Sequence, residues 1–334
     1  MTRRRFTDID MAKGLAIFLV VLGHVVARQP PVGNAWYEEL KQLLYKFHMP
    51  FFMFLSGAVF HASYTPLDSV AAYRRYAAKK AARLVPGFLL FSLIIWSAKA
   101  VGSLFLHVDN VQLDAIDALL RIVTKPSTSV AGSLWYIYVL FEFQLVFPLV
   151  LGLFRRSLAA VLALSVALHV ASLAFQMTQL LAIDRFCAYA LFFSLGLLFI
   201  EHYAAVVAFV LDRALLFYGL FAFSFLAILL WPGDLSKTII GLCSLPALYA
   251  FVASFRGSRD RLALLTLGEY SFSIYLMNTL FIGFTKGVLL TVLPWDGGNF
   301  LLFFPLLLTA GVVGPIGLHR HALARIPYLG RITK

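Results

Sequence analysis

Three ionisable residues interrupt the first apolar stretch of the chain, DMAKGLAIFLVVLGH at positions 10–24. They are Asp10, Lys13 and His24. Ionisable groups at membrane depth are costly and usually face a protein interior or a wet cavity. On a helix, Lys13 and His24 fall near one stripe, separated by about 16 Å along the axis at 1.5 Å per residue. The spacing therefore predicts a cation near the cytoplasmic surface and an imidazole deeper in the membrane, on one helix face.

His24 has the chemistry of a general base. A neutral imidazole can take a proton from a hydroxyl nucleophile, and it titrates close to neutral pH. The alternative is a core histidine that bonds a neighbouring hydroxyl. The shared face with Lys13 favours the catalytic interpretation.

The stretch YKFHMPFFMFLSGAVF, positions 45–60, carries a second histidine. We expect His48 at the outer end of the second helix, where it binds the acceptor or is simply an interfacial residue. Pro50 is tolerated in a first helical turn. Ser56 and Gly57 allow a neighbouring helix to approach closely.

Lys80 and Arg83 stand three residues apart and share a helix face just before the third apolar span. Both side chains pair with phosphate, so the spacing predicts a phosphate clamp. Basic residues at an inner helix end also follow from topology and anionic lipid alone.

Glu142 lies in the otherwise apolar stretch LWYIYVLFEFQLVFP, positions 134–148. A buried carboxylate needs a partner or must stay protonated. Pairing with His24 or Lys13 would provide that partner, and a carboxylate-oriented histidine is a known way to build a general base. Trp135, in the same stretch, is either an interfacial aromatic or a substrate contact.

Near the end of the chain, LGEYSFSIYLMNTLF covers positions 267–281. Tyr275 and Asn278 stand three residues apart and are expected to face the bundle interior. They either form hydrogen bonds between helices or contact the substrate.

Composition identifies the chain as a membrane protein. Of 334 residues, 61% are hydrophobic and 13% are charged, with a mean hydropathy of +0.86. A soluble domain carries about 25% charged residues. The simplest interpretation is one all-α membrane helix bundle over residues 1–334.

About 20 apolar residues are needed to span a bilayer, and ten stretches are candidates. They lie at 11–27, 47–62, 85–106, 134–153, 157–175, 186–203, 214–231, 237–255, 266–285 and 299–318. The basic start Arg3-Arg4-Arg5 precedes an apolar run without a small-residue cleavage signal, which predicts an uncleaved first span. The longest outer loop, at about 107–133, either covers a site or is a solvated connection.

With the N-terminus in the cytoplasm, most of the 28 lysines and arginines fall in inner segments. The bias predicts ten helices with both termini cytoplasmic. It also explains the net charge of +12 without a nucleic-acid partner.

Together, these motifs resemble the acyltransferase 3 family of bacterial integral-membrane acyltransferases. The resemblance rests on DIDMAKGLAIFLVVLGH, FHMPFFMFLSG, KAARLVP, the LWY…FP helix and YSFSIYL, and it extends from about Asp8 to Leu280. It implies a ten-helix protein of the bacterial inner membrane. Such a protein takes an acyl group, usually acetyl, from cytoplasmic acyl-CoA. The acceptor is a hydroxyl of a sugar on a lipid-linked or surface glycan, as in exopolysaccharide and fucose-type acetyltransferases.

The resemblance also implies roles for particular residues. Lys13 and His24 match the family's basic residue and first-helix histidine, with lysine in place of the commoner arginine. Lys80 and Arg83 match the family's Arg-x-x-Arg pair, and no metal is expected. His24 would deprotonate the acceptor hydroxyl or carry the acyl group transiently.

A proton-coupled transporter or exporter is the main alternative, since a buried lysine, histidine and glutamate can form a proton relay. No convincing inverted halves or paired broken helices are visible in the sequence, which favours the acyltransferase.

Overall fold

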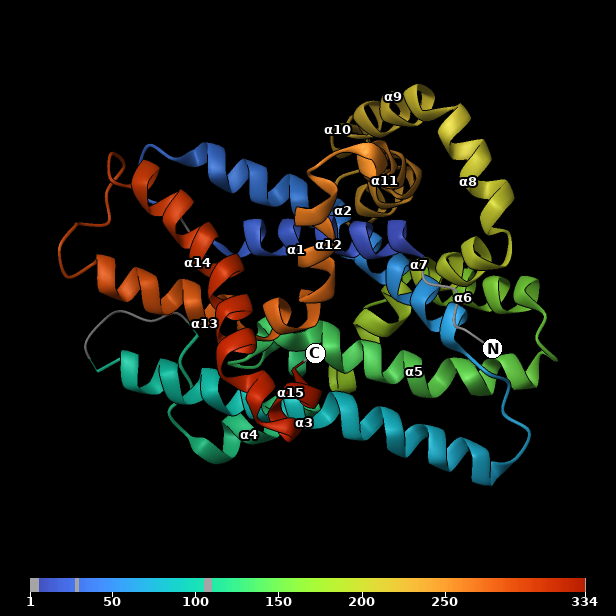
Figure 1. Ribbon diagram of the computed structural model, residues 1–334, viewed down its shortest axis with the longest axis horizontal. Coiled ribbons are helices and arrows are strands. Elements are labelled where there is room, and N and C mark those ends of the chain that lie inside the picture. Colours follow the sequence, from blue (N-terminus) through green and yellow to red (C-terminus); the bar gives the residue numbers. More distant parts are fainter. Residues whose placement is uncertain (1–5, 28–29, 105–109, 334) are drawn as a thin grey trace.

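The computed structural model describes residues 6–27, 30–104 and 110–333, and it is built of helices joined by loops and short 3₁₀ turns (Figure 1). The basic start Arg3-Arg4-Arg5 and residues 107–109 of the expected outer loop lie outside the described residues. The helices are α1 Thr7–His24, α2 Ala35–Ser63, α3 Val70–Gly102, α4 Ala115–Thr124, α5 Trp135–Leu153, α6 Leu158–Ala174, α7 Ile183–Glu201, α8 Tyr203–Asp212, α9 Ala214–Ser224, α10 Ala227–Leu230, α11 Asp234–Ser254, α12 Arg261–Glu269, α13 Ser271–Leu289, α14 Phe300–His321 and α15 Pro327–Ile332.

Within the described ranges, seven helices are long and apolar enough to cross a membrane: α2, α3, α5, α7, α11, α13 and α14. An eighth crossing is possible if α8 and the following segment Ala214–Leu230 form one span, although they bend by 78° at Arg213. The chain is therefore a multi-pass membrane protein. The count of ten and the cytoplasmic position of both ends remain predictions. α1 carries three charged residues and α6 has 17 residues, so both fall outside the set of seven.

α1 lies in the middle of the bundle, while α3 runs along the lower edge of the view and α9 and α10 along the upper edge (Figure 1). α1 contacts α2, α11, α12, α13 and α14. α12 crosses α1 at very short range, because a Cβ on Gly14 would lie 2.0 Å from the Leu264 carbonyl oxygen. A Cβ on Gly268 would likewise lie 1.9 Å from the Asp10 carbonyl oxygen. Only glycine permits this crossing.

α2 and α7 form a second close crossing, as the Ser56-Gly57 pair suggested. A Cβ on Gly57 would lie 1.9 Å from the Phe193 carbonyl oxygen, and a Cβ on Gly196 would lie 2.1 Å from that of Phe54. Small residues let membrane helices approach in this way. The crossing fixes α2 at residues 54–57 against α7.

Three regions of the chain differ from the sequence expectation. α2 begins at Ala35, so His48 lies in mid-helix instead of at a helix end, and Pro50 lies inside the helix. The expected span 266–285 is two helices, α12 and α13, which meet at a sharp angle at Tyr270 (Figure 1). The expected loop 107–133 contains α4, whose N-cap Asp114 accepts hydrogen bonds from two backbone N–H groups.

Candidate active site

His24 meets Asn278, 254 residues away in the sequence. His24 is the last residue of α1, and its Nδ1 lies 2.8 Å from Oδ1 of Asn278 on α13. The Asn278 Nδ2 donates to the carbonyl oxygens of Ile274 at 2.9 Å and Tyr275 at 3.0 Å. Because the amide hydrogens are used there, the amide oxygen faces the imidazole, and His24 donates its Nδ1–H. This pattern leaves the lone pair of His24 on Nε2.

His48 has the same tautomer. Its Nδ1 lies 2.6 Å from the carbonyl oxygen of Leu44, which can only accept, so Nε2 carries the lone pair. The Nε2 atoms of His24 and His48 have no hydrogen-bond partner among the described residues, yet neither is one of the fully enclosed unpaired atoms. His24 is partly buried, whereas His48 is buried with 4% of its surface exposed. The two rings also interact electrostatically, so one region of the bundle holds two potential proton acceptors.

Tyr275 lies one turn before Asn278 and ties α13 to the start of α5. Its hydroxyl donates to the Ser133 carbonyl oxygen at 2.6 Å and accepts from the backbone N–H of Tyr136 at 3.3 Å. The Tyr136 hydroxyl in turn lies 2.6 Å from Oγ of Ser56 on α2. This network holds α2, α5 and α13 together beside His24, which agrees with the interhelical alternative for Tyr275.

Trp135 belongs to a mixed group on α5 and α7, here called the α5–α7 polar cluster: Trp135, Glu142, Asp184, Arg185 and Tyr189. The rings of Trp135 and Tyr189 stack with centroids 5.3 Å apart. The Arg185 guanidinium lies 5.4 Å from the centre of the Trp135 ring, and its Nε is 3.5 Å from Asp184 Oδ2. Asp184 is also an electrostatic neighbour of Glu142.

Three polar atoms of this cluster are buried without a hydrogen-bond partner in the described part of the chain: Glu142 Oε2, Asp184 Oδ1 and Arg185 Nε. Buried polar atoms are normally paired with protein or water. The cluster therefore contains polar atoms whose hydrogen-bonding capacity the described residues do not use.

The expected pairing of Glu142 with His24 or Lys13 is not found. Asn278 occupies the Nδ1 side of His24, and the Lys13 Nζ lies 3.2 Å from Asp10 Oδ1. A neutral amide, not a carboxylate, therefore holds the imidazole.

The predicted phosphate clamp lies on α3. The Lys80 Nζ is 5.2 Å from the centre of the Tyr76 ring, and Arg83 is exposed. The Tyr76 hydroxyl donates to Oε1 of Gln144 at 2.9 Å, which fastens this part of α3 to α5.

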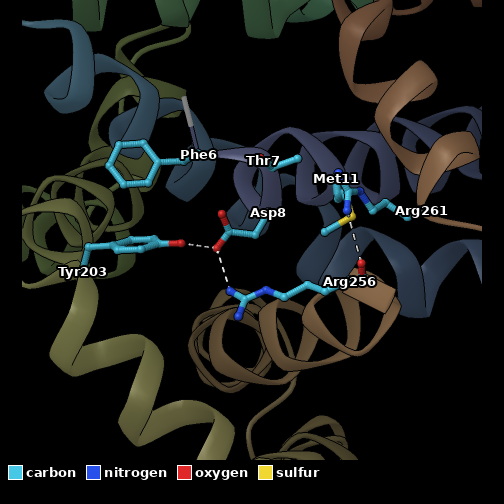
Figure 2. Close-up of a pocket in the computed structure, with 7 residues that line it drawn as sticks. All are labelled: Phe6, Thr7, Asp8, Met11, Tyr203, Arg256 and Arg261. Carbon is cyan, nitrogen blue, oxygen red and sulfur yellow. Dashed lines mark hydrogen bonds and ion pairs between the residues drawn. The ribbon is translucent and has the colours of Figure 1, made fainter. Parts of the chain in front are cut away.

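A cavity of about 380 Å³ lies at the start of α1 (Figure 2). Its lining residues are Phe6, Thr7, Asp8, Met11, Tyr203, Arg256 and Arg261. The carboxylate of Asp8 accepts hydrogen bonds from the hydroxyls of Tyr203 and Tyr249. The Arg256 Nη2 lies 3.1 Å from Oδ2 of the same carboxylate. This arrangement joins α1 to α8 and α11.

Comparison with known proteins gives the family. The model of the acyltransferase domain family matches residues 6–320, nearly the whole chain. The chain belongs to the acyltransferase 3 family.

Two curated relatives of this acyltransferase are nodulation proteins NolL. The protein of Mesorhizobium japonicum is 27% identical over 187 residues, which cover 54% of this chain and 45% of the relative. The protein of Sinorhizobium fredii is 30% identical over 138 residues, covering 40% of this chain and 33% of the relative. The alignments thus span less than half of either relative. No solved structure matches the acyltransferase significantly.

Several residues of the acyltransferase that line these sites were not singled out by sequence reasoning. Asp8 and Arg256 meet across 248 positions, for which the sequence gives no signal. The sequence did give a signal for Asp184 and Arg185, since both charged residues directly precede the apolar run 186–203. The role of Asn278 was foreseen only as a contact with another helix or the substrate.

Proposed function

We propose that this acyltransferase moves an acetyl group from acetyl-CoA to a hydroxyl of a sugar carried by a lipid-linked or cell-surface glycan. In this proposal it crosses the bacterial inner membrane ten times, with both termini in the cytoplasm. The donor enters from the cytoplasm and the acceptor from the outer side.

The observation that carries the proposal is the state of His24. Its Nδ1–H is held by Asn278 at 2.8 Å, its Nε2 has no hydrogen-bond partner in the described part of the chain, and the side chain is only partly buried. A fixed imidazole with one free lone pair is the arrangement that a general base needs. Membership of an acyltransferase family supplies the reaction in which the base acts.

The proposed reaction has two proton transfers. The His24 Nε2 takes the proton of the acceptor hydroxyl while that oxygen attacks the thioester carbonyl carbon. The carbon–sulfur bond then breaks, and the imidazolium returns its proton to the departing thiolate. Asn278 acts as a positioning residue, because it keeps the hydrogen on Nδ1 throughout.

The acceptor would lie against the α5–α7 polar cluster and His48. The stacked rings of Trp135 and Tyr189 offer a flat apolar face. The unpaired oxygens of Glu142 and Asp184 are enclosed, so side chains of the cluster would move aside to let sugar hydroxyls donate to them. We therefore assign Glu142 to acceptor binding, not to orienting His24. Tyr275 and its bonds to the start of α5 would form the wall between this cluster and the base.

Lys13, Lys80 and Arg83 are the proposed donor contacts. Cationic side chains pair with the phosphates of CoA. Lys13 stands about 16 Å before His24 along α1, so the donor's phosphates and its thioester can lie at different depths.

A transfer assay tests the proposal. The purified protein is incubated with labelled acetyl-CoA and a sugar-lipid acceptor, and covalent product is measured. We expect His24→Ala to lower kcat by about 10²- to 10⁴-fold, the usual contribution of a general base. The control is His202→Ala, which changes an exposed histidine between α7 and α8. Movement of the acceptor across the membrane without covalent product would overturn the acyltransferase reaction, and full activity of folded His24→Ala would overturn the role of His24.

A further inference from the structure

The cavity at the start of α1 has the properties of a phosphate-binding site. Its volume of about 380 Å³ lies within the usual range of ligand pockets, about 300–1,000 Å³. Its wall comes from four separate segments: the first turn of α1, α8, the 3₁₀ turn Phe255–Gly257 and α12 (Figure 2). The site is therefore assembled by the tertiary fold.

The only carboxylate in its lining is neutralised by its neighbours. Oδ2 of Asp8 accepts hydrogen bonds from the hydroxyls of Tyr203 and Tyr249 and from the Arg256 guanidinium. The Arg256 Nη2 also lies 3.4 Å from the Tyr249 hydroxyl, so this guanidinium is held at the cavity wall. Of the guanidinium nitrogens of Arg256, only Nη2 takes part in these bonds.

Arg261 adds a second guanidinium, which donates to the carbonyl oxygen of Arg256 at 3.4 Å (Figure 2). Two guanidiniums against one carboxylate leave the lining with an excess positive charge. Planar guanidinium forks match phosphate oxygens and bind them through paired hydrogen bonds. The N-cap of α1, Phe6, makes no side-chain capping bond, so first-turn N–H groups add to the positive potential.

The other carboxylate in the first turn of α1 is paired as well. The Lys13 Nζ lies 3.2 Å from Oδ1 of Asp10. An anion in the cavity therefore meets two guanidiniums and a helix N-terminus, with both nearby carboxylates engaged by cations or hydroxyls. A phosphate ester has the matching charge and shape.

We propose that this cavity binds phosphate groups of the acyl donor, in addition to Lys80 and Arg83. The inference rests on the proposed acyl transfer. Along α1, Asp8 and His24 lie about 24 Å apart. The donor's diphosphate and extended arm span roughly 17 Å to the sulfur, taken at about 1.15 Å per bond as in an extended peptide. The Arg261 side chain and the imidazole cover the remaining distance.

Arg261→Gln tests the assignment in the full-length protein reconstituted in vesicles. We expect the KM for acetyl-CoA to rise about 10-fold, as for loss of one bond between a charged donor and phosphate. The KM for acetyl-pantetheine, which has the thioester but no phosphate, should change less than about 2-fold. The matched control is Arg213→Gln, which removes an exposed cation at the bend between α8 and α9, outside the cavity lining.

An equal effect on both donors, or none on either, would overturn the assignment. A phosphate of a lipid headgroup is the other source of the same chemistry. In that case, Arg261→Gln would change the ratio of activities in phosphatidylglycerol and phosphatidylcholine vesicles and leave both KM values unchanged, and the donor site would be rejected.

A binding measurement separates this inference from the proposed reaction. If wild-type protein transfers no acetyl group, the reaction fails, and the cavity is then tested by titrating CoA into the purified protein. A Kd raised about 10-fold by Arg261→Gln, relative to Arg213→Gln, supports the cavity as a CoA phosphate site. An unchanged Kd rejects it.

Discussion

Replacing Asn278 by alanine tests whether the amide orients the base. The change removes the acceptor 2.8 Å from His24 Nδ1 and leaves that N–H without a partner. An unsatisfied buried donor costs about 1–3 kcal/mol. At about 1.36 kcal/mol for each tenfold change in rate, kcat should fall about 5- to 160-fold.

The assay is acetyl transfer by the purified protein at saturating donor and acceptor. A positioning residue affects the bound complex, so kcat should fall while both KM values stay within about 2-fold. Asn278→Asp keeps an oxygen acceptor for Nδ1–H but loses the Nδ2 bonds to Ile274 and Tyr275 and introduces a carboxylate, so we expect it to recover only part of the lost kcat. A general loosening of α13 would not be rescued by aspartate.

Thr279→Ala is the matched control. It alters the next residue of α13 and removes only a 3.5 Å contact with Ser133. If Asn278→Ala keeps wild-type kcat and a wild-type melting temperature, the amide does not orient His24.

Two further predictions concern the helix crossing and the polar cluster. Gly196→Ala places a Cβ 2.1 Å from the Phe54 carbonyl oxygen, so we expect a loss of about 1–3 kcal/mol of stability, measured as a lower melting temperature in detergent. The control is Gly152→Ala, whose new Cβ would have nothing within 4 Å and which should melt as the wild type does. Equal melting temperatures of all three proteins would contradict the close crossing. Glu142→Gln keeps the side-chain shape but replaces one carboxyl oxygen by an amide group, so the KM for a sugar acceptor should rise about 5-fold and that for acetyl-CoA should not. An unchanged acceptor KM would remove Glu142 from the acceptor site.

Runs of apolar residues predicted the straight helices well, because a membrane helix needs about 20 such residues and length alone reveals them. The stretch 134–153 corresponds to α5 and 299–318 to most of α14. The breaks were harder to place. The bend at Arg213 coincides with a charged pair in an apolar run, whereas the break at Tyr270 has no Pro and depends on how α12 packs across α1.

The candidate base was predictable, and its partner was not. His24 is conspicuous because an imidazole is costly in an apolar helix. Asn278 lies on another helix, and several polar residues near it, among them Ser273 and Tyr275, were equally plausible neighbours from sequence alone. The structure brings Asn278 to His24 on α1, whereas the Tyr275 hydroxyl bonds the start of α5.

The use of an amide here has a physical reason. A carboxylate beside His24 would add a second ionisable group to an apolar region, where desolvating a charge is far more costly than desolvating an amide. Asn278 fixes the same tautomer without that charge, and it satisfies its own N–H groups within α13. Glu142 and Asp184 lie instead in the α5–α7 polar cluster, together with Arg185. In the proposed mechanism, the residue that orients the base is therefore separate from the groups that hold the acceptor. Changes at Asn278 should lower kcat, and changes at Glu142 should raise the KM for the acceptor.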